Sequence, residues 1–354
     1  MIKKIKIINY RGIQKMELDN FKKYNIFVGD NSSCKTTVLE ALFSSLYQNY
    51  DRLIVTANSR GMQVRTDNIH NFFYNADLRK KIEFVLNDKI ITKITTRSPQ
   101  NIENEKITEN IGNERIFENM GNMPLSIINQ NVKLLYNFLQ EDMRNKKITD
   151  VNIMIDNFNN ISIQEETIIN YDEQKKSVWI TPLSKYQSGV AQVVKSIIED
   201  KKKKELMKVI NILEPEIDDI VSDGFEVKLS KNNVKRMLSL SSFGNGLSSI
   251  ISTISNLVNE DAKILFIDEI EDGIHYLNYS KFCNALIKIA EAREIQLFIT
   301  THSKEFIEAF YNNLKNDEEN ITLYRFQRLN NEVKEVFYSK ENVMYALKEG
   351  WDIR

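Results

Sequence analysis

A stretch near the amino end, residues 25–37, restricts the possible folds of this chain more than any other. Its first residues, Asn25–Val28, predict a short buried strand, and the run that starts at Thr36 predicts a helix. A tight loop joins the two. In a strand, loop and helix of this kind, backbone N–H groups of the loop and the positive end of the helix dipole converge on one point. The stretch therefore predicts a site for a polyphosphate.

Particular residues of this loop suit particular parts of a nucleotide. Lys35 can reach the β- and γ-phosphates, and the Thr36 hydroxyl can ligate Mg²⁺. The usual spacing is G-x-x-x-x-G-K-[ST], but here Cys34 takes the place of the second glycine, so its Cβ crowds the phosphate. An ordinary strand, turn and helix is the alternative interpretation of this segment alone. The candidate binding residues are Gly29, Asp30, Asn31, Ser32, Ser33, Cys34, Lys35, Thr36 and Thr37.

Two later apolar runs, at 263–269 and 296–301, predict neighbouring strands of a parallel sheet. A helix expected over 278–292 would join them as a βαβ unit. At the end of the first strand, Asp268 would hold Mg²⁺ through the water shell of the metal, and Glu269 would act as the general base for an attacking water. This pair would complete the site that the Lys35 loop begins.

His302 follows the second of these strands. The carboxyl end of a parallel strand is where open α/β sheets bind ligands, so His302 could sense or orient the γ-phosphate. The alternative is a histidine at a helix start, since Ser303 could cap a helix through Phe306 and Ile307.

The segment Ser242–Gly246 precedes an apolar helix expected from Leu247 to about Val258. Its serine and two glycines predict a second anion-binding helix start, or alternatively a plain flexible one. One nucleotide cannot easily use both starts in one copy. Two copies facing head to tail could, with each Ser242 helix capping the ATP held by the Lys35 of the other copy.

Bulk composition narrows the class of protein. The chain has 354 residues, of which 42% are hydrophobic and 27% charged, as in ordinary globular proteins. Its net charge of −1 argues neither for nor against nucleic acid. Two cysteines cannot form a disulfide framework or a zinc site, and no apolar run approaches membrane-spanning length. We expect a cytoplasmic protein without a membrane partner.

Together these motifs resemble the ABC-type ATPases of the SMC/RecF-like class, most closely the OLD-like and AbiEii-like AAA ATPases of bacterial anti-phage defence. The resemblance implies ATP and Mg²⁺ as cofactors. It adds Arg11, Ser242, Gly244 and Gly246 to the nucleotide-binding candidates, and Gln63 as the Q-loop glutamine at the metal. The matching motifs are an opening strand and turn at Ile5–Gly12, Walker A at Gly29–Thr37, the signature at Ser242–Gly246, Walker B at Ile264–Glu269, the D-loop at Glu271–His275 and the switch histidine at Thr301–Ser303.

The sequence departs from this family pattern at four positions. Ser32 and Cys34 replace glycines of the phosphate loop, which predicts weak turnover. Asn245 replaces an acidic residue of the signature, and Tyr276 follows His275 where proline is usual.

The implied fold is α/β, an ABC-type ATPase core with a β-rich amino-terminal lobe and a helical insertion. Residues 1–97 would hold the first part of the core, and residues 221–354 the second. Between them, 98–220 would form a loop and a helical insertion, because an apolar period of 3.6 runs over 127–144 and 188–213.

The expected function is that of an ATPase that assembles as a dimer or higher oligomer around ATP. As sensor or scaffold it would control a separate effector, a toxin or nuclease, through the segment 125–220. One rival is a DNA-binding repair ATPase of the RecF type that uses the run Lys201–Lys204. Another is an assembly protein that has lost hydrolysis, although it would not need to keep Asp268 and Glu269.

Overall fold

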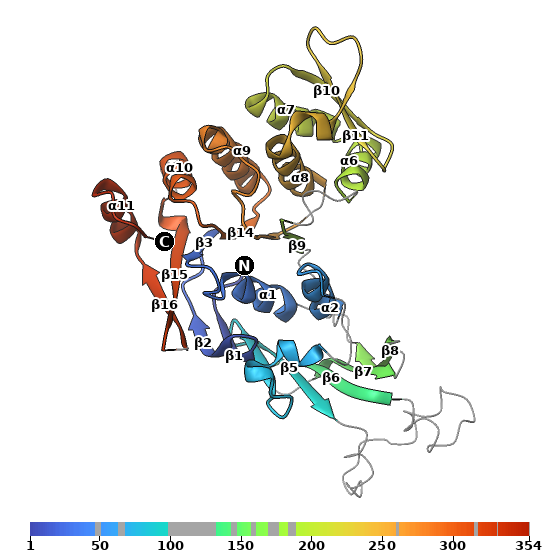
Figure 1. Ribbon diagram of the computed structural model, residues 1–354, viewed down its shortest axis with the longest axis vertical. Helices are drawn as coiled ribbons and strands as arrows, with labels where there is room; N and C mark the ends of the chain where they lie inside the picture. Colours follow the sequence, from blue (N-terminus) through green and yellow to red (C-terminus); the bar gives the residue numbers. More distant parts are fainter. Residues whose placement is uncertain are drawn as a thin grey trace, which may run out of the picture. The chain divides into compact units, whose positions relative to one another are not determined.

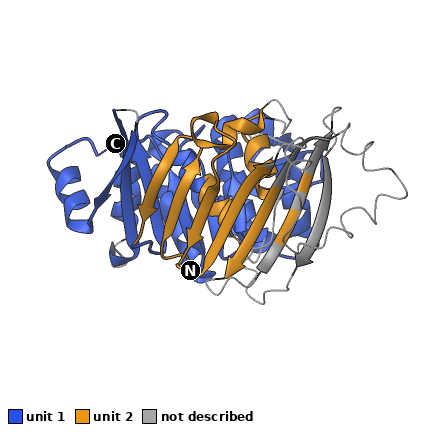
Figure 2. Cartoon of the chain, turned by 90° about the horizontal axis from the view of Figure 1, so that it is seen from below, with its two compact units in different colours: residues 1, 20–39, 175–354 blue, residues 2–19, 40–174 orange. Residues whose placement is uncertain are grey.

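The computed structural model divides the chain into two compact units, shown separately coloured in Figure 2. Unit 1 holds residues 1, 20–39 and 175–354, and unit 2 holds residues 2–19 and 40–174. The structure describes residues 1–46, 51–62, 68–97, 132–142, 147–156, 161–168, 177–182, 189–259, 262–314, 318–330 and 332–353.

Unit 1 is built on a six-stranded sheet in the order β16-β15-β3-β14-β13-β9. Strands β9, β13, β14, β3 and β15 run parallel, and only β16 is antiparallel. Strand β14 therefore lies between β3, which precedes the phosphate loop, and β13, which precedes Asp268. The strands are β3 (Tyr24–Gly29), β9 (Ser177–Ile180), β13 (Ile264–Ile267), β14 (Gln296–Thr300), β15 (Ile321–Leu329) and β16 (Glu332–Tyr338).

The two faces of this sheet pack differently. Alternate residues such as Ile26, Ile267 and Ile299 join an aliphatic core with the helices of unit 1. Helices α8, α9 and α10 lie side by side over that face (Figure 1). The other face carries a buried aromatic layer, in which Phe266 and Phe298 stack with ring centroids 5.3 Å apart. Burial on both faces explains why these strands are continuous apolar runs.

The helices of unit 1 follow the expected apolar period. In α8, the residues Ile250, Ile254 and Leu257 face the core, with none more than 2% exposed. The helices are α6 (Gly189–Glu199), α7 (Lys203–Leu213), α8 (Asn245–Asn259), α9 (Tyr279–Ala292), α10 (Lys304–Leu314) and α11 (Lys340–Lys348), and the short helical turns are η4 (Leu240–Phe243), η5 (Tyr276–Asn278) and η6 (Glu318–Asn320). A small sheet of β10 (Ile217–Ser222), β11 (Val227–Lys231) and β12 (Leu238–Ser239) completes the unit.

Unit 2 contains a seven-stranded sheet in the order β2-β1-β4-β5-β6-β7-β8, in which every neighbouring pair is antiparallel. Helix α1 (Lys35–Ser45) begins in unit 1 and ends in unit 2. The remaining elements are β1 (Ile5–Tyr10), β2 (Ile13–Leu18), α2 (Asp51–Asn58), η1 (Ile69–Phe72), η2 (Tyr74–Ala76), β4 (Ile82–Leu86), β5 (Ile90–Arg97), β6 (Val132–Asp142), β7 (Lys147–Asp156) and β8 (Ile161–Ile168).

The predicted helix over 127–144 is wrong where the structure describes it, because Val132–Asp142 is strand β6. Apolar residues such as Leu134, Leu135 and Phe138 imitate a helical period. However, β6 extends the sheet beside β5, and Phe138 lies opposite Ile94 with both side chains buried. Pairing with a distant strand overrides the local period. Among the described residues of 98–220, the helices are α6 and α7, and the first part of the segment, 98–131, lies outside the described residues.

Candidate nucleotide site

The phosphate loop starts at Gly29, where only glycine fits. Its φ is 137°, a conformation that other residues rarely adopt. A Cβ built there would lie 2.2 Å from the carbonyl oxygen of Phe326 on the neighbouring strand β15. The close approach of these two strands therefore depends on the missing side chain.

Ser32 and Cys34 keep the backbone shape that the family pattern assigns to glycine. Their φ values are 62° and 72°, both in the left-handed region. For residues with a Cβ, that region costs about 1–2 kcal/mol each. The loop therefore retains the turn that the glycine pattern predicts, at a cost in stability.

The variant Cys34→Gly is expected to raise the free energy of unfolding by about 1 kcal/mol, because glycine adopts φ 72° without steric cost. Urea denaturation measures the change. As a control, Lys288→Gly on the exposed side of α9 should lower the free energy of unfolding by about 1 kcal/mol, since there glycine only adds entropy to the unfolded chain. A destabilised Cys34→Gly variant would contradict the argument.

Lys35 lies folded over its own loop. Its Nζ donates to the carbonyl oxygens of Gly29 at 2.9 Å and Asp30 at 2.8 Å, and the residue is 5% exposed. Burial lowers the pKa of Lys35, while nearby carboxylates, Asp268 first, act to raise it. An anionic phosphate in the loop would favour the charged ammonium in the same way.

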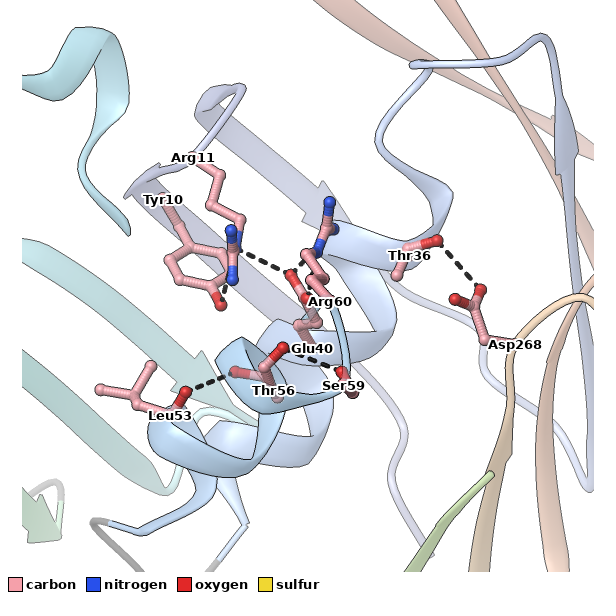
Figure 3. Close-up of polar contacts among 9 residues, drawn as sticks. All are labelled: Tyr10, Arg11, Thr36, Glu40, Leu53, Thr56, Ser59, Arg60 and Asp268. Carbon is pink, nitrogen blue, oxygen red and sulfur yellow. Dashed lines mark hydrogen bonds and ion pairs between the residues drawn. The ribbon is translucent and has the colours of Figure 1, made fainter. Parts of the chain in front are cut away.

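Thr36 and Asp268 connect the loop to the acidic strand. The Thr36 Oγ1 donates to Asp268 Oδ1 at 3.0 Å (Figure 3). Thr36 is the second residue of α1, and Asp268 directly follows β13. Since β14 separates β3 from β13, the contact spans the carboxyl ends of three neighbouring parallel strands. The structure thus brings together two residues that the sequence analysis assigned to the metal.

The other candidate residues of the loop, and Glu269 after β13, differ in their exposure to solvent. Ser33 and Thr37 are buried, whereas Asp30, Asn31 and the carboxylate-bearing Glu269 are exposed. Glu269 has φ 48°, and its backbone N–H donates to Thr300 Oγ1 at 2.8 Å. Sequence reasoning did not single out Thr300, although its position two residues before His302 places it at the same strand end.

His302 lies just beyond β14 and is half-buried. Its backbone N–H donates to Glu271 Oε1, so the turn after Walker B holds the histidine loop in place. Burial, followed by the positive charge of Lys35, lowers the pKa of His302 below its ordinary value of 6.5. The imidazole is therefore neutral near pH 7 and can accept or donate one hydrogen bond.

This lowered pKa predicts a pH effect on stability. Between the folded-state pKa and 6.5, the unfolded chain binds more protons than the folded chain. The contribution of His302 to the free energy of unfolding is therefore complete above pH 6.5 and decreases as the pH falls. Between pH 8 and pH 5.5, the free energy of unfolding should fall more in the native sequence than in His302→Gln, as measured by urea denaturation. Equal losses in the two proteins would disprove this effect.

The signature residues lie on a different element from the Lys35 loop. Ser242 belongs to η4, and Gly244, with φ 84°, joins η4 to α8; both are exposed. Gly246 packs tightly, because a Cβ there would lie 2.8 Å from the carbonyl oxygen of Gly273. The structure therefore joins the signature helix to the D-loop of the same chain and leaves Ser242 and Gly244 open to solvent.

Arg11, assigned by resemblance to the nucleotide, belongs to a charge cluster within unit 2. Its Nε lies 2.9 Å from Glu40 Oε2, and Arg60 Nε donates to Glu40 Oε1 at 2.6 Å (Figure 3). Glu40 is fully buried, and the Arg11 guanidinium lies 4.8 Å from the ring centroid of Phe72. Sequence reasoning missed Glu40, which carries no motif signal.

Gln63, the candidate Q-loop residue, lies outside the residues that the structure describes. Its assignment to the metal remains a prediction.

Known proteins are similar to this chain in sequence and in fold. A family model described as "AAA domain, putative AbiEii toxin, Type IV TA system" matches residues 143–308, which include the signature, Asp268, Glu269 and His302. An ATP/GTP phosphatase of Helicobacter pylori is 25% identical over 336 residues, covering 87% of each chain. The DNA replication and repair protein RecF of Alkaliphilus oremlandii is 27% identical over 78 residues, which cover 20% of this chain and 21% of RecF.

Solved structures show the fold class. An SMC head bound to the C-terminal winged-helix domain of ScpA matches with a TM-score of 0.53 at 11% identity, covering 97% of this chain and 99% of that one. A second SMC head, bound to the C-terminal domain of ScpA derived from Pyrococcus furiosus, matches with a TM-score of 0.50 at 10% identity and 98% coverage of both chains. The mixed α/β fold is therefore that of SMC head domains, in agreement with the fold class that the sequence predicts.

Proposed function

We propose that this chain is a Mg²⁺-dependent nucleoside triphosphatase of the ABC type that acts on ATP. The observation that carries the proposal is the hydrogen bond between Thr36 Oγ1 and Asp268 Oδ1, at 3.0 Å. It joins the phosphate loop to the acidic strand in the arrangement that phosphoryl transfer requires. The similarity to an ATP/GTP phosphatase supports the same chemistry and makes GTP a second substrate to test.

The donor atoms at this point fit Mg²⁺. Thr36 and Asp268 both present oxygen, the ligand that Mg²⁺ prefers, and such sites use one or two protein ligands with waters and substrate phosphates. Among the described residues, no group of three or more His, Cys, Asp or Glu could hold a metal by itself. A metal at this point would neutralise charge that develops on the phosphates.

Each side chain has a role that its position suits. Lys35 would exchange its loop carbonyls for the β- and γ-phosphates, and Glu269 would accept a proton from the attacking water. The neutral His302 imidazole would orient the γ-phosphate or that water by a hydrogen bond.

The first test is phosphate release by the purified protein with ATP and with GTP. We expect hydrolysis that requires Mg²⁺ and that is lost in Lys35→Ala together with nucleotide binding. Lys288→Ala, on the exposed side of α9, is the matched control and should leave turnover unchanged. Absence of both binding and turnover in the native protein would overturn the proposal.

The exposed signature supports the further proposal that two copies assemble around ATP. Ser242 and Gly244 are open to solvent just before α8 and could cap the nucleotide held by a second copy. Sedimentation should then show an ATP-dependent dimer, and Ser242→Arg should remain monomeric with ATP. A native protein that stays monomeric with ATP and Mg²⁺ would contradict the assembly.

We also propose that the chain is a sensor or scaffold that controls a separate toxin or nuclease in the cytoplasm during anti-phage defence. The description of the matching family, which names a putative toxin and a type IV TA system, supports a place in a system of this kind. No helix in the described part of the chain is long and apolar enough to cross a membrane. Co-expression with a neighbouring gene product and scoring of phage resistance, with Lys35→Ala as the control, would test it.

The short similarity to RecF favours one alternative, a DNA-binding repair ATPase. Within the run Lys201–Lys204, however, Lys202 Nζ donates to the Asn259 carbonyl at 3.1 Å and Lys203 pairs with Asp219 at 2.6 Å. Only Lys201 and Lys204 are exposed. If the alternative holds, duplex DNA should stimulate turnover, and the double variant Lys201→Glu/Lys204→Glu should abolish the stimulation.

A further inference from the structure

A buried hydroxyl lies behind the two acidic residues of the candidate site. Thr300 is the last residue of β14, and it is 0% exposed. Strand β14 lies between β3 and β13, so Thr300 is placed at the strand end that the Lys35 loop and Asp268 flank. A buried hydroxyl at such a position must have its hydrogen bonds satisfied by protein groups.

Both hydrogen bonds of this hydroxyl go to the Walker B end. Thr300 Oγ1 donates to Asp268 Oδ1 at 2.6 Å, and it accepts the backbone N–H of Glu269 at 2.8 Å. A hydroxyl has one proton to donate and lone pairs to accept with. Here the proton is used for the bond to Asp268, and a lone pair accepts the N–H of Glu269. One side chain thus contacts both consecutive acidic residues.

These contacts restrict each acidic residue in a specific way. Asp268 Oδ1 accepts from Thr36 and from Thr300, so the carboxylate is held from two sides. Glu269 has φ 48°, a left-handed conformation that costs a residue with a Cβ about 1–2 kcal/mol and needs support from its surroundings. The bond to the Thr300 hydroxyl and the bond from Ile270 N–H to the Thr300 carbonyl, at 3.1 Å, provide that support.

We propose that Thr300 is a positioning residue that holds Asp268 towards Mg²⁺ and Glu269 towards the attacking water. This inference rests on the proposed nucleoside triphosphatase function. Thr300 itself would touch neither the metal nor the nucleotide. It would act by fixing the orientation of one carboxylate and the backbone of the other, in the way that outer groups commonly orient metal ligands.

The test compares Thr300→Val, which removes the hydroxyl at nearly constant shape, with Thr300→Ser, which keeps it. A fluorescent ATP analogue reports binding in EDTA and across a Mg²⁺ titration. In Thr300→Val, the half-saturating Mg²⁺ concentration should rise and kcat should fall, each by about 10- to 100-fold, the usual cost of losing such a contact. Binding in EDTA should stay unchanged, and Thr300→Ser should restore both quantities to within a few-fold of the native values.

Thr322→Val is the matched control for a purely structural effect. Thr322 is 2% exposed in the same sheet, and its Oγ1 donates to the Asn20 carbonyl at 2.7 Å, so Thr322→Val removes one buried hydroxyl bond where Thr300→Val removes two. Both valine variants should lose thermal stability, Thr300→Val the more because it removes two hydrogen bonds, but only Thr300→Val should change the Mg²⁺ dependence. If Thr300→Val does not fold, Thr300→Ala provides the same loss of the hydroxyl without added bulk.

The outcomes separate this inference from the proposed function. Native protein that binds and hydrolyses ATP, together with a Thr300→Val variant that has the Mg²⁺ dependence of Thr322→Val, would overturn the role of Thr300 alone. Failure of Thr300→Ser to restore the Mg²⁺ dependence would also overturn it. Native protein that neither binds the analogue nor releases phosphate would overturn the proposed function, and the inference with it.

Discussion

Replacing Glu269 with glutamine should lower kcat for ATP hydrolysis by about 10²- to 10⁴-fold, the usual contribution of a general base. ATP binding should persist, because Lys35, Thr36 and Asp268 are unchanged. The backbone N–H of Glu269, which donates to Thr300 Oγ1 at 2.8 Å, is also retained in the variant. The substitution therefore removes the proton acceptor and retains this backbone hydrogen bond.

In Glu269→Gln, single-turnover phosphate release measures the loss of hydrolysis, and a fluorescent ATP analogue measures whether binding persists. The control is Glu291→Gln, an exposed carboxylate on α9 that should leave both unchanged. If two copies assemble around ATP, the slow variant should also accumulate as a stable dimer in sedimentation. Turnover close to that of the native protein would show that Glu269 is not the base.

Replacing Glu40 with glutamine should lower the free energy of unfolding by about 3 kcal/mol, the lower end of the cost of breaking a buried ion pair. Glu40 is 0% exposed and accepts from Arg60 at 2.6 and 3.1 Å, while its Oε2 lies 2.9 Å from Arg11 Nε. The Arg11 side chain is only 10% exposed. The neutral amide of the Glu40→Gln variant would leave the buried positive charge of the Arg11 guanidinium without a compensating carboxylate.

Urea denaturation of Glu40→Gln measures this cost, and two variants calibrate it. Glu83→Gln removes a more exposed pair, in which Lys81 lies 2.7 Å from the carboxylate, and should change the free energy of unfolding by no more than about 1 kcal/mol. Arg60→Gln should cost less than Glu40→Gln, because Arg60 is 37% exposed and Glu40 keeps Arg11. A Glu40→Gln change as small as that of Glu83→Gln would mean that the cluster contributes little.

Prediction from sequence succeeded where the signal is local. The strand, loop and helix around Lys35 match β3 and α1, and the apolar runs before Asp268 and His302 match β13 and β14. These elements depend on residues a few positions apart, so their apolar patterns and turn residues were sufficient.

Prediction failed where the outcome depends on distant residues. The segment of β6 has a helix-like apolar period, but its pairing with β5 makes it a strand. The two strands are separated by more than thirty positions in the chain, and they pair at residues such as Ile94 and Phe138. Strands β15 and β16 at the carboxyl end were not identified, although β15 places the Phe326 carbonyl against Gly29. Pairing partners of this kind leave no short-range pattern.

The chemical groups of the candidate site can be read from short stretches of the chain: a loop with Lys35 and Thr36, an acidic pair and a histidine, each at the end of a predicted strand. The hydrogen bonds that hold these groups depend on the packing of the sheet. The strand order brings Thr36 to Asp268, and it places the Thr300 hydroxyl against both acidic residues. The physical reason is that motif residues are read from neighbours in the chain, whereas a buried hydrogen bond joins groups that only the packed sheet brings together.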